Sequence, residues 1–309
     1  MGRFYTEYSD FLTRLFPGVK VQKISIDAGH NCPNRDGTLG RGGCIYCNNS
    51  AFSPSYCHTA GSVRAQIEQG RRFFARKYPS MQYLAYFQAY TSTHAPLAEL
   101  QAAYEEALYC PGTVGLVIGT RPDCMPPALL DYLAEVNRSR VPVIVEYGVE
   151  SLHDTTLDLI RRRHTAECAL ETIAATRHAG IRTGAHLIMG LPGESLQMML
   201  HTVNLICARG IDILKFHQLQ VVKGTALWEI WNALQNGLPL PSGFEDFPDF
   251  RTFSLEEYIS LCRDIISLVP RTTAIERFTA QCPPQLLAAP SWGIKNHEFV
   301  NLLHSRLCR

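Results

Sequence analysis

Short apolar runs alternate with amphipathic runs along most of the chain, and this rhythm constrains the fold more than any other feature. The apolar runs are rich in Val, Ile, Leu and Tyr and are too short for helices, so we expect strands there. They cover residues 20–26, 82–88, 113–118, 142–148, 182–189 and 212–219. Helical patterns lie between them and after the last one, at about 60–78, 96–109, 126–138, 152–179 (in two pieces), 194–209 and 254–269.

Strands and helices that alternate in this way form parallel strands with right-handed crossovers. Six such units are too few for a closed eight-unit barrel, so the sequence predicts an α/β fold, a partial (β/α)6 TIM-type barrel of parallel strands. We expect an N-terminal segment over residues 1–19, the barrel core over 20–225, and a C-terminal extension of helices and loops over 226–309 that packs on the barrel. In barrel enzymes the chemistry lies at the carboxyl ends of the strands.

Composition limits the compartment and the partners. The formal net charge is +1, so whole-chain charge neither requires nor excludes a nucleic acid. No segment approaches the roughly 18 apolar residues of a membrane span, and the first residues lack the pattern of a signal peptide. We therefore expect a cytoplasmic protein without a membrane partner. In that compartment its 11 cysteines stay reduced, which favours metal or catalytic roles over disulfides.

A glycine-rich loop directly after the first predicted strand carries Cys32, Cys44 and Cys47 in the spacing C-x11-C-x2-C. Its glycines permit positive φ angles and leave backbone N–H groups free to bond sulfides. Three thiolates can hold a [4Fe–4S] cluster that keeps one iron open for a ligand. The alternatives are a zinc site completed by Cys57, a thioredoxin-like pair of Cys44 and Cys47, or unligated core cysteines.

The cysteine loop, with Tyr46 directly before its last cysteine, resembles the cluster motif of the radical S-adenosylmethionine (SAM) superfamily, which usually reads C-x3-C-x-aromatic-C. The longer first gap is similar to that of the group related to the Elongator catalytic subunit. Within that group the chain most resembles the YhcC/YtqA-type family, and its C-terminal extension does so as well. Motifs between about residues 20 and 225 carry the resemblance: KISIDAG, CPNRDG, YFQAYTST, GTRPDC, VEYGVES, HLIMGLPGE and KFHQLQVVKGT.

The resemblance implies a set of cofactors. Cys32, Cys44 and Cys47 would bind three irons of the [4Fe–4S] cluster, and SAM would chelate the fourth iron through its amino and carboxylate groups. One electron, from a donor such as flavodoxin or ferredoxin, would split SAM into methionine and a 5′-deoxyadenosyl radical. The SAM contacts that the resemblance implies are Tyr46, Gln88, Glu150, Arg162, His186 and Ile188.

The implied contacts have different chemistry. Tyr46 would lie near the adenine, to which Ile188 would offer backbone hydrogen bonds. Glu150 would contact the ribose or the amino-acid part, and His186 stands where relatives carry a polar contact, often Asp. Gln88 stands at the end of the second strand, where many members carry a Gly-Gly-Glu motif that holds the methionyl amine. Its amide oxygen accepts a hydrogen bond but carries no charge.

Structural roles compete with these assignments. Glu146 and Glu150 share one face of a predicted strand, and each is either a partner in an ion pair or a SAM contact. Arg162 is otherwise part of a solvated helix end, favourable to the helix dipole.

For two further pairs of residues, the sequence leaves open whether the role is structural or is contact with the substrate. Arg121 either pairs with Asp123 or faces the substrate. Lys215 and His217 alternate on the sixth predicted strand, and we expect the one that faces the barrel interior to contact substrate.

The resemblance also implies a substrate, because the Elongator-related branch acts on the wobble uridine of tRNA. Hydrogen abstraction from a carboxymethylaminomethyl group on uridine, leading toward an aminomethyl product, is the specific hypothesis. Basic residues would follow the phosphates, or else form ordinary surface: Arg64, Arg71, Arg72, Arg76, Lys77, Arg138, Arg140 and 161–163, with Phe73, Phe74 and Tyr78 between the first of them. The alternatives are a radical SAM enzyme for a small molecule or peptide, and a zinc-binding interaction protein.

Overall fold

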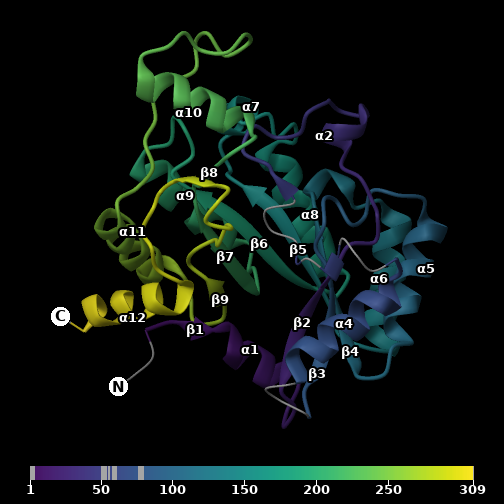
Figure 1. Cartoon of the computed structure of the whole chain (residues 1–309). Coiled ribbons are helices and arrows are strands. Elements are labelled where there is room, and N and C mark those ends of the chain that lie inside the picture. The colour runs from purple at the N-terminus through teal and green to yellow at the C-terminus, as the bar shows by residue number, and fades with distance from the viewer. Residues whose placement is uncertain (1–3, 50–53, 55, 58–60, 76–79, 309) are drawn as a thin grey trace.

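The computed structural model describes residues 4–49, 54, 56–57, 61–75 and 80–308. Within them, eight strands form one curled parallel sheet in the order β1-β9-β7-β6-β5-β4-β3-β2 (Figure 1). The bounds of the central strands are β2 Val21–Ile26, β3 Gln82–Phe87, β4 Thr113–Thr120, β5 Val143–Glu150, β6 Arg182–Met189 and β7 Ile213–Gln218. These are the six strands expected from the sequence, and the predicted partial barrel is confirmed.

Two short edge strands extend the sheet beyond the predicted six. β1 (Thr6–Glu7) pairs with β9 (Ala274–Arg277), and β9 pairs with β7, both in parallel. Two and four residues are too few to show a period in the sequence, so neither strand was expected. The segments on both sides of the barrel core therefore contribute to the same sheet.

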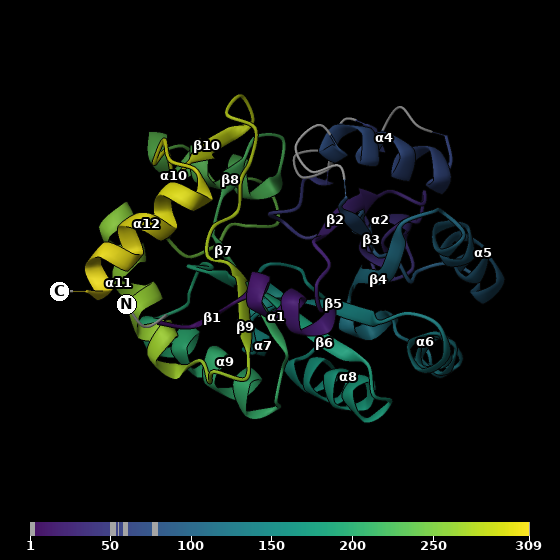
Figure 2. The ribbon, with the colours of Figure 1, turned by 90° about the horizontal axis from the view of Figure 1, so that it is seen from below.

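Helices cover the outer face of the sheet (Figure 2). They are α4 Val63–Ala75, α5 Leu97–Leu108, α6 Pro127–Ser139, α7 Asp154–Leu159, α8 Ala166–His178, α9 Leu196–Ala208 and α11 Leu255–Leu268, which match the predicted helical runs. Side-chain caps begin several of them; Ser254 and Glu257 form a capping box at the start of α11. Gly180, with φ of 80°, follows the C-cap Ala179 of α8 and so occupies the C′ position.

The amino end of the barrel is closed by an apolar plug. Helix α1 (Tyr8–Leu15) lies across this end, where Phe11 and Phe16 pack on inward-facing residues such as Leu84 and Ile144. Because this end is filled, the cavity of the barrel opens toward the carboxyl ends of the strands.

The C-terminal extension forms one side of the open end. Helix α10 (Ala226–Asn236) precedes a loop that leads to α11, and α12 (Asn296–Leu307) packs on α11. β8 (Val221–Val222) pairs antiparallel with β10 (Leu287–Ala289). The chain between β9 and β10 therefore runs beside the carboxyl end of β7.

Candidate functional site

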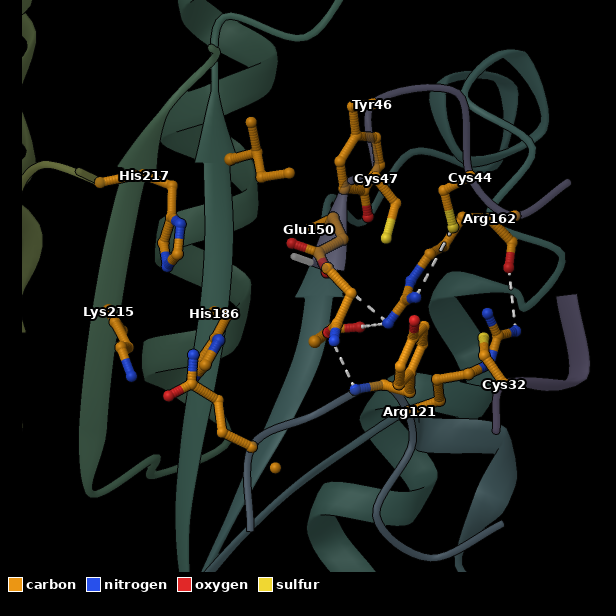
Figure 3. A pocket seen from close by; sticks show the side chains of 18 of the residues that line it. Cys32, Cys44, Tyr46, Cys47, Arg121, Glu150, Arg162, His186, Lys215 and His217 are labelled. Atoms are coloured by element: carbon orange, nitrogen blue, oxygen red, sulfur yellow. Dashed lines mark hydrogen bonds and ion pairs between the residues drawn. The ribbon is translucent and has the colours of Figure 1, made fainter. Parts of the chain in front are cut away.

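One cavity lies at the carboxyl ends of the strands, and the residues predicted for the site meet there (Figure 3). The nine that line it are Cys32, Cys44, Cys47, Tyr46, Gln88, Glu150, Arg162, His186 and Ile188. They come from the loop after β2, the end of β3, β5, the loop after α7, and β6. The structure thus brings together every residue of the predicted set, although its roles remain predictions.

The cysteine loop is held by short turns. Cys32 is the N-cap of α2 (Pro33–Asp36), and its carbonyl oxygen accepts a hydrogen bond from the backbone N–H of Arg35 at 2.7 Å. The N–H of Cys47 donates to the carbonyl oxygen of Cys44 at 3.0 Å. Gly43 has φ of 84°, and a Cβ there would lie 3.0 Å from Arg35 Nε. A side chain at this position would disturb the loop that carries the thiols.

The environment of the three thiols fits an iron–sulfur cluster. Burial raises the pKa of the Cys47 thiol, and nearby Cys44 and Cys32 raise it further, so the sulfurs share one electrostatic environment. Within the described residues, no three His, Cys, Asp or Glu side chains are arranged to hold a single metal ion. A cubane does not require that arrangement, because each cysteine binds a different iron.

Cys57, which a zinc site would need as its fourth ligand, lies elsewhere. Its thiol donates to the carbonyl oxygen of Ser25 at 3.4 Å, and it is not among the residues that line the cavity.

Arg162 is buried beside the thiols rather than solvated at a helix end. Its flanking residues Arg161 and Arg163 have φ of 55° and 64° and are exposed, so this turn points Arg162 inward. Arg162 Nη1 lies 3.8 Å from Cys44 Sγ, and Nη2 lies 3.6 Å from Glu150 Oε1. Its side chain therefore contacts both the cysteine loop and the end of β5.

Neutral His164 orients Arg162 through a hydrogen bond to its guanidinium. Burial and the charge of Arg162 lower the pKa of His164 to about 3, so its ring accepts a hydrogen bond from Arg162 Nε at 3.1 Å. Burial raises the pKa of Glu150, which the charge of Arg162 partly opposes. Glu150 itself has φ of 66° and follows a β-bulge, so its carboxylate faces the cavity through an irregular strand end.

Arg121 pairs with Asp123, which is the first of its two predicted alternatives. Its Nε and Nη2 donate to the two carboxylate oxygens of Asp123 at 2.8 and 2.7 Å, and it also lines the cavity. Its Nη1 is buried and has no hydrogen-bond partner among the described residues. An unpaired buried donor is costly unless a ligand accepts from it. The site thus offers a cationic N–H suited to a carboxylate such as that of SAM.

The remaining predicted SAM contacts have different surroundings, which are apolar for two of them and polar for the other two. Ile188 and Tyr46 belong to one apolar cluster with Ile45, which suits a flat aromatic ligand. Gln88 Oε1 already accepts a hydrogen bond from Ser25 Oγ at 3.1 Å. His186 lies deeper, with Nε2 2.8 Å from Glu146 Oε2, and burial lowers its pKa to about 4.

A ring of buried charges lies between the apolar plug and the cavity. Lys23 Nζ lies 2.5 Å from Glu146 Oε1 and 2.6 Å from Glu276 Oε2. Lys215 Nζ lies 3.3 Å from Glu146 Oε2 and 3.4 Å from Glu276 Oε1. Glu146 is therefore an ion-pair partner, the first of its two alternatives.

Sequence reasoning missed two members of this ring. Glu276 lies on β9, a strand that was not expected. Lys23 carried a usable signal, because it faces inward from a strand whose outward-facing neighbours Ile24 and Ile26 are buried and apolar. Lys215 and His217 both line the cavity, so the expectation that one of the two faces the interior was wrong. Residues two positions apart on a strand share a face.

No helix in the described part of the chain is long and apolar enough to cross a membrane.

Comparison with known proteins identifies the family. A model of the radical SAM superfamily matches residues 30–206, and one of the radical SAM C-terminal domain matches residues 245–309. YhcC of Escherichia coli K12 is 36% identical over 282 residues, 91% of this chain and 85% of that protein. YtqA of Bacillus subtilis is 32% identical over 290 residues, 94% of this chain and 85% of that protein.

More distant similarity extends to Elongator-type proteins. A tRNA uridine(34) acetyltransferase of Methanocaldococcus infernus is 27% identical over 167 residues, 53% of this chain and 28% of that protein. The solved structure of archaeal Elp3 from the same organism, lacking residues 1–46, superposes with a TM-score of 0.65 at 18% identity, over 94% of this chain and 63% of that chain. It shares the fold. The chain belongs to the radical SAM superfamily and, within it, to the family of YhcC and YtqA.

Proposed function

We propose that this radical SAM enzyme binds a [4Fe–4S] cluster through Cys32, Cys44 and Cys47, binds SAM in the same cavity, and modifies the side chain of the wobble uridine in tRNA. The observation that carries the cofactor assignment is that all nine predicted residues, from five separate segments, line one cavity. When bound, the cluster and SAM supply a 5′-deoxyadenosyl radical that abstracts hydrogen from a substrate.

The chain's own residues position these groups. Arg162, held by His164, places a buried positive charge 3.8 Å from the sulfur of Cys44. Arg121 offers the unpaired Nη1 to the carboxylate of SAM. Tyr46 and Ile188 provide apolar surface for the adenine and, with Ile45, exclude water from that side of the cavity.

Support for tRNA comes from the distant relative and from the charge near the mouth. The relative's name specifies uridine 34 of tRNA. Arg161 and Arg163 are exposed beside the cavity residue Arg162, and the Arg161 guanidinium lies 4.0 Å from the ring centre of Phe244. Phosphate contacts by such residues would add affinity that falls with salt.

The other predicted basic residues contribute differently. Arg138 and Arg140 pair with Glu135 and Glu105, and they precede β5, at the end of the barrel opposite the cavity. We therefore leave them out of the RNA surface. Arg64, Arg71, Arg72, Phe73 and Phe74 lie on α4, with Phe73 68% exposed, whereas Arg76, Lys77 and Tyr78 lie outside the described residues.

Radical SAM enzymes need an electron donor, for which we propose a flavodoxin or ferredoxin. The specific substrate that we propose is a carboxymethylaminomethyl group on the wobble uridine, converted toward an aminomethyl group. Hydrogen abstraction from the methylene beside the carboxylate would leave a carbon radical, which would give back the electron that SAM cleavage consumed and become an imine. Addition of water would then break the C–N bond and release the aminomethyl group and glyoxylate.

Nucleoside mass spectrometry of tRNA tests the substrate. Cells that lack this protein should accumulate the carboxymethylaminomethyl nucleoside and lose products derived from the aminomethyl nucleoside. Complementation with the wild-type chain should restore the profile, and complementation with Cys44→Ala should not. An unchanged set of wobble nucleosides would rule out this substrate, while cluster binding and SAM cleavage by the purified protein would test the cofactor assignment separately.

A further inference from the structure

One wall of the cavity carries a positive charge that the barrel interior does not balance. Lys23 and Lys215 each contact the same two carboxylates, those of Glu146 and Glu276, so these four charges compensate one another. Arg277 directly follows Glu276 on β9, lines the cavity, and forms no ion pair among the described residues. One cation therefore remains on this wall.

The neighbours of Arg277 do not neutralise it. Its Nη2 lies 2.8 Å from His217 Nε2, and His217 stacks on His186 with ring centres 5.6 Å apart. Burial lowers the pKa of both histidines, so both rings are neutral. His217 thus accepts a hydrogen bond from the guanidinium and fixes its position without supplying a negative charge.

The guanidinium keeps an unused donor. Arg277 Nε is buried and has no hydrogen-bond partner in the part of the chain that the structure describes. A buried N–H without an acceptor is costly, and a guanidinium fork matches a carboxylate in geometry and charge. This wall lies across the cavity from the cysteines, where Lys215 and His217 appear in Figure 3.

An unused acceptor lies on the same wall. Gln220 is 8% exposed, and its Nε2 donates to the carbonyl oxygen of Ala280 at 3.2 Å. Since that carbonyl can only accept, the amide orientation of Gln220 is determined and Oε1 faces away from it. Oε1 is buried and has no partner among the described residues, whereas Gln218 bonds both the N–H and the carbonyl oxygen of Ala280. Gln220 can therefore accept from a ligand.

We propose that Arg277 binds a carboxylate of the substrate and that Gln220 accepts a hydrogen bond from an N–H of the same substrate. This inference rests on the proposed function, whose candidate side chain carries both a terminal carboxylate and an amine. Arg277 and Ala280 belong to the C-terminal extension, so this extension contributes to substrate binding, whereas the cysteine loop, Glu150 and Arg162 serve the cofactors.

Free nucleosides provide the test. Binding of 5-carboxymethylaminomethyluridine and 5-aminomethyluridine is measured by calorimetry on the full chain with reconstituted cluster and SAM. The wild type should bind the carboxylated nucleoside about tenfold or more tightly, as expected for a hydrogen-bonded charge pair. Arg277→Gln should remove this preference, and Arg277→Lys should keep part of it because the charge remains without the fork. Gln220→Met should weaken the binding of both nucleosides equally, since both nucleosides contain the amine.

Arg209→Gln is the matched control, because Arg209 is an exposed arginine at the end of α9, which leads into the start of β7 at the opposite end of the barrel. It should keep the full preference. SAM affinity and cluster absorbance should be retained in Arg277→Gln, and equal loss of SAM affinity would show that Arg277 serves the cofactor instead.

Other outcomes would also overturn the inference. The first is a preference for the carboxylated nucleoside that persists in Arg277→Gln. If that variant does not fold, a full preference in Arg277→Lys has the same meaning. The second is displacement of the carboxylated nucleoside by inorganic phosphate at equal concentration. If the wild type binds neither nucleoside, the inference fails, and the wobble-nucleoside profile of cells decides independently whether the proposed function fails with it.

Discussion

The two sides of the cavity are built in different ways. On the cofactor side the cysteines lie within one loop, and each buried arginine has a carboxylate nearby, Asp123 for Arg121 and Glu150 for Arg162. On the opposite side the groups come from β2, β5, β6, β7 and β9, and Arg277 has no carboxylate partner among the described residues. The comparison indicates that the cysteines of the cofactor side are locally encoded and that its buried arginines are charge-balanced. The other side depends on tertiary closure and keeps one arginine without a carboxylate partner among the described residues.

The largest expected effect is on the cofactor side. Cys44→Ala should abolish both the visible absorbance of the cluster and the formation of 5′-deoxyadenosine with dithionite, because one iron loses its ligand. Cys57→Ala is the control and should keep both, since its thiol contacts the backbone of Ser25. If Cys44→Ala still forms 5′-deoxyadenosine, the ligand assignment is wrong.

The second effect tests whether the opposite side is a rigid charged framework. Glu146→Gln should lower the free energy of unfolding by about 3–5 kcal/mol in urea, because it leaves buried lysines without full compensation. Glu135→Gln removes an exposed partner of Arg138 and should change that free energy by less than about 1 kcal/mol. Equal effects of the two substitutions would mean that the ring is solvated and does not brace the barrel.

The third effect concerns pH on the same side. The pKa of His186 is lowered to about 4 in the folded protein, chiefly by burial and by Lys215, against an ordinary value of 6.5. The unfolded chain therefore takes up the proton first, and stability should fall as pH decreases from about 6.5 to about 4, by up to about 3 kcal/mol. His186→Gln should lose this part of the slope of unfolding free energy against pH. An unchanged slope would contradict a neutral, buried His186.

The smallest effect returns to the cofactor side. Arg162→Ala should weaken SAM binding by about 2 kcal/mol while the cluster absorbance persists, because a charged hydrogen-bond donor is lost. Arg161→Ala, at an exposed position in the same turn, should leave the SAM dissociation constant unchanged. Equal losses in both variants would show that the turn, and not the Arg162 guanidinium, supports SAM.

The sequence predictions were accurate where structure depends on interactions between residues close in sequence, and less accurate elsewhere. The six central strands and their helices were predicted because each has its own hydrophobic period. The bulge before Glu150 was not predicted. The expectation that Glu146 and Glu150 share one face assumed strict alternation, and the register shift after Gly148 interrupts that alternation. The sequence analysis left open whether Arg162 points inward. The left-handed backbone of Arg161 and Arg163, which flank it, has no signal in the composition.

The sequence by itself determined the alternation of strands and helices, the cysteine loop and its motif, and the set of residues that meet at the carboxyl ends. These features depend on local periods and spacings, and parallel strands necessarily bring their carboxyl ends to one edge. Only the tertiary structure decided that β1 and β9 join the sheet, that Glu146 pairs with two lysines, and that Arg277 has no carboxylate partner within the described ranges. Such pairings join residues up to more than 250 positions apart, and burial rather than local pattern determines which charges are compensated.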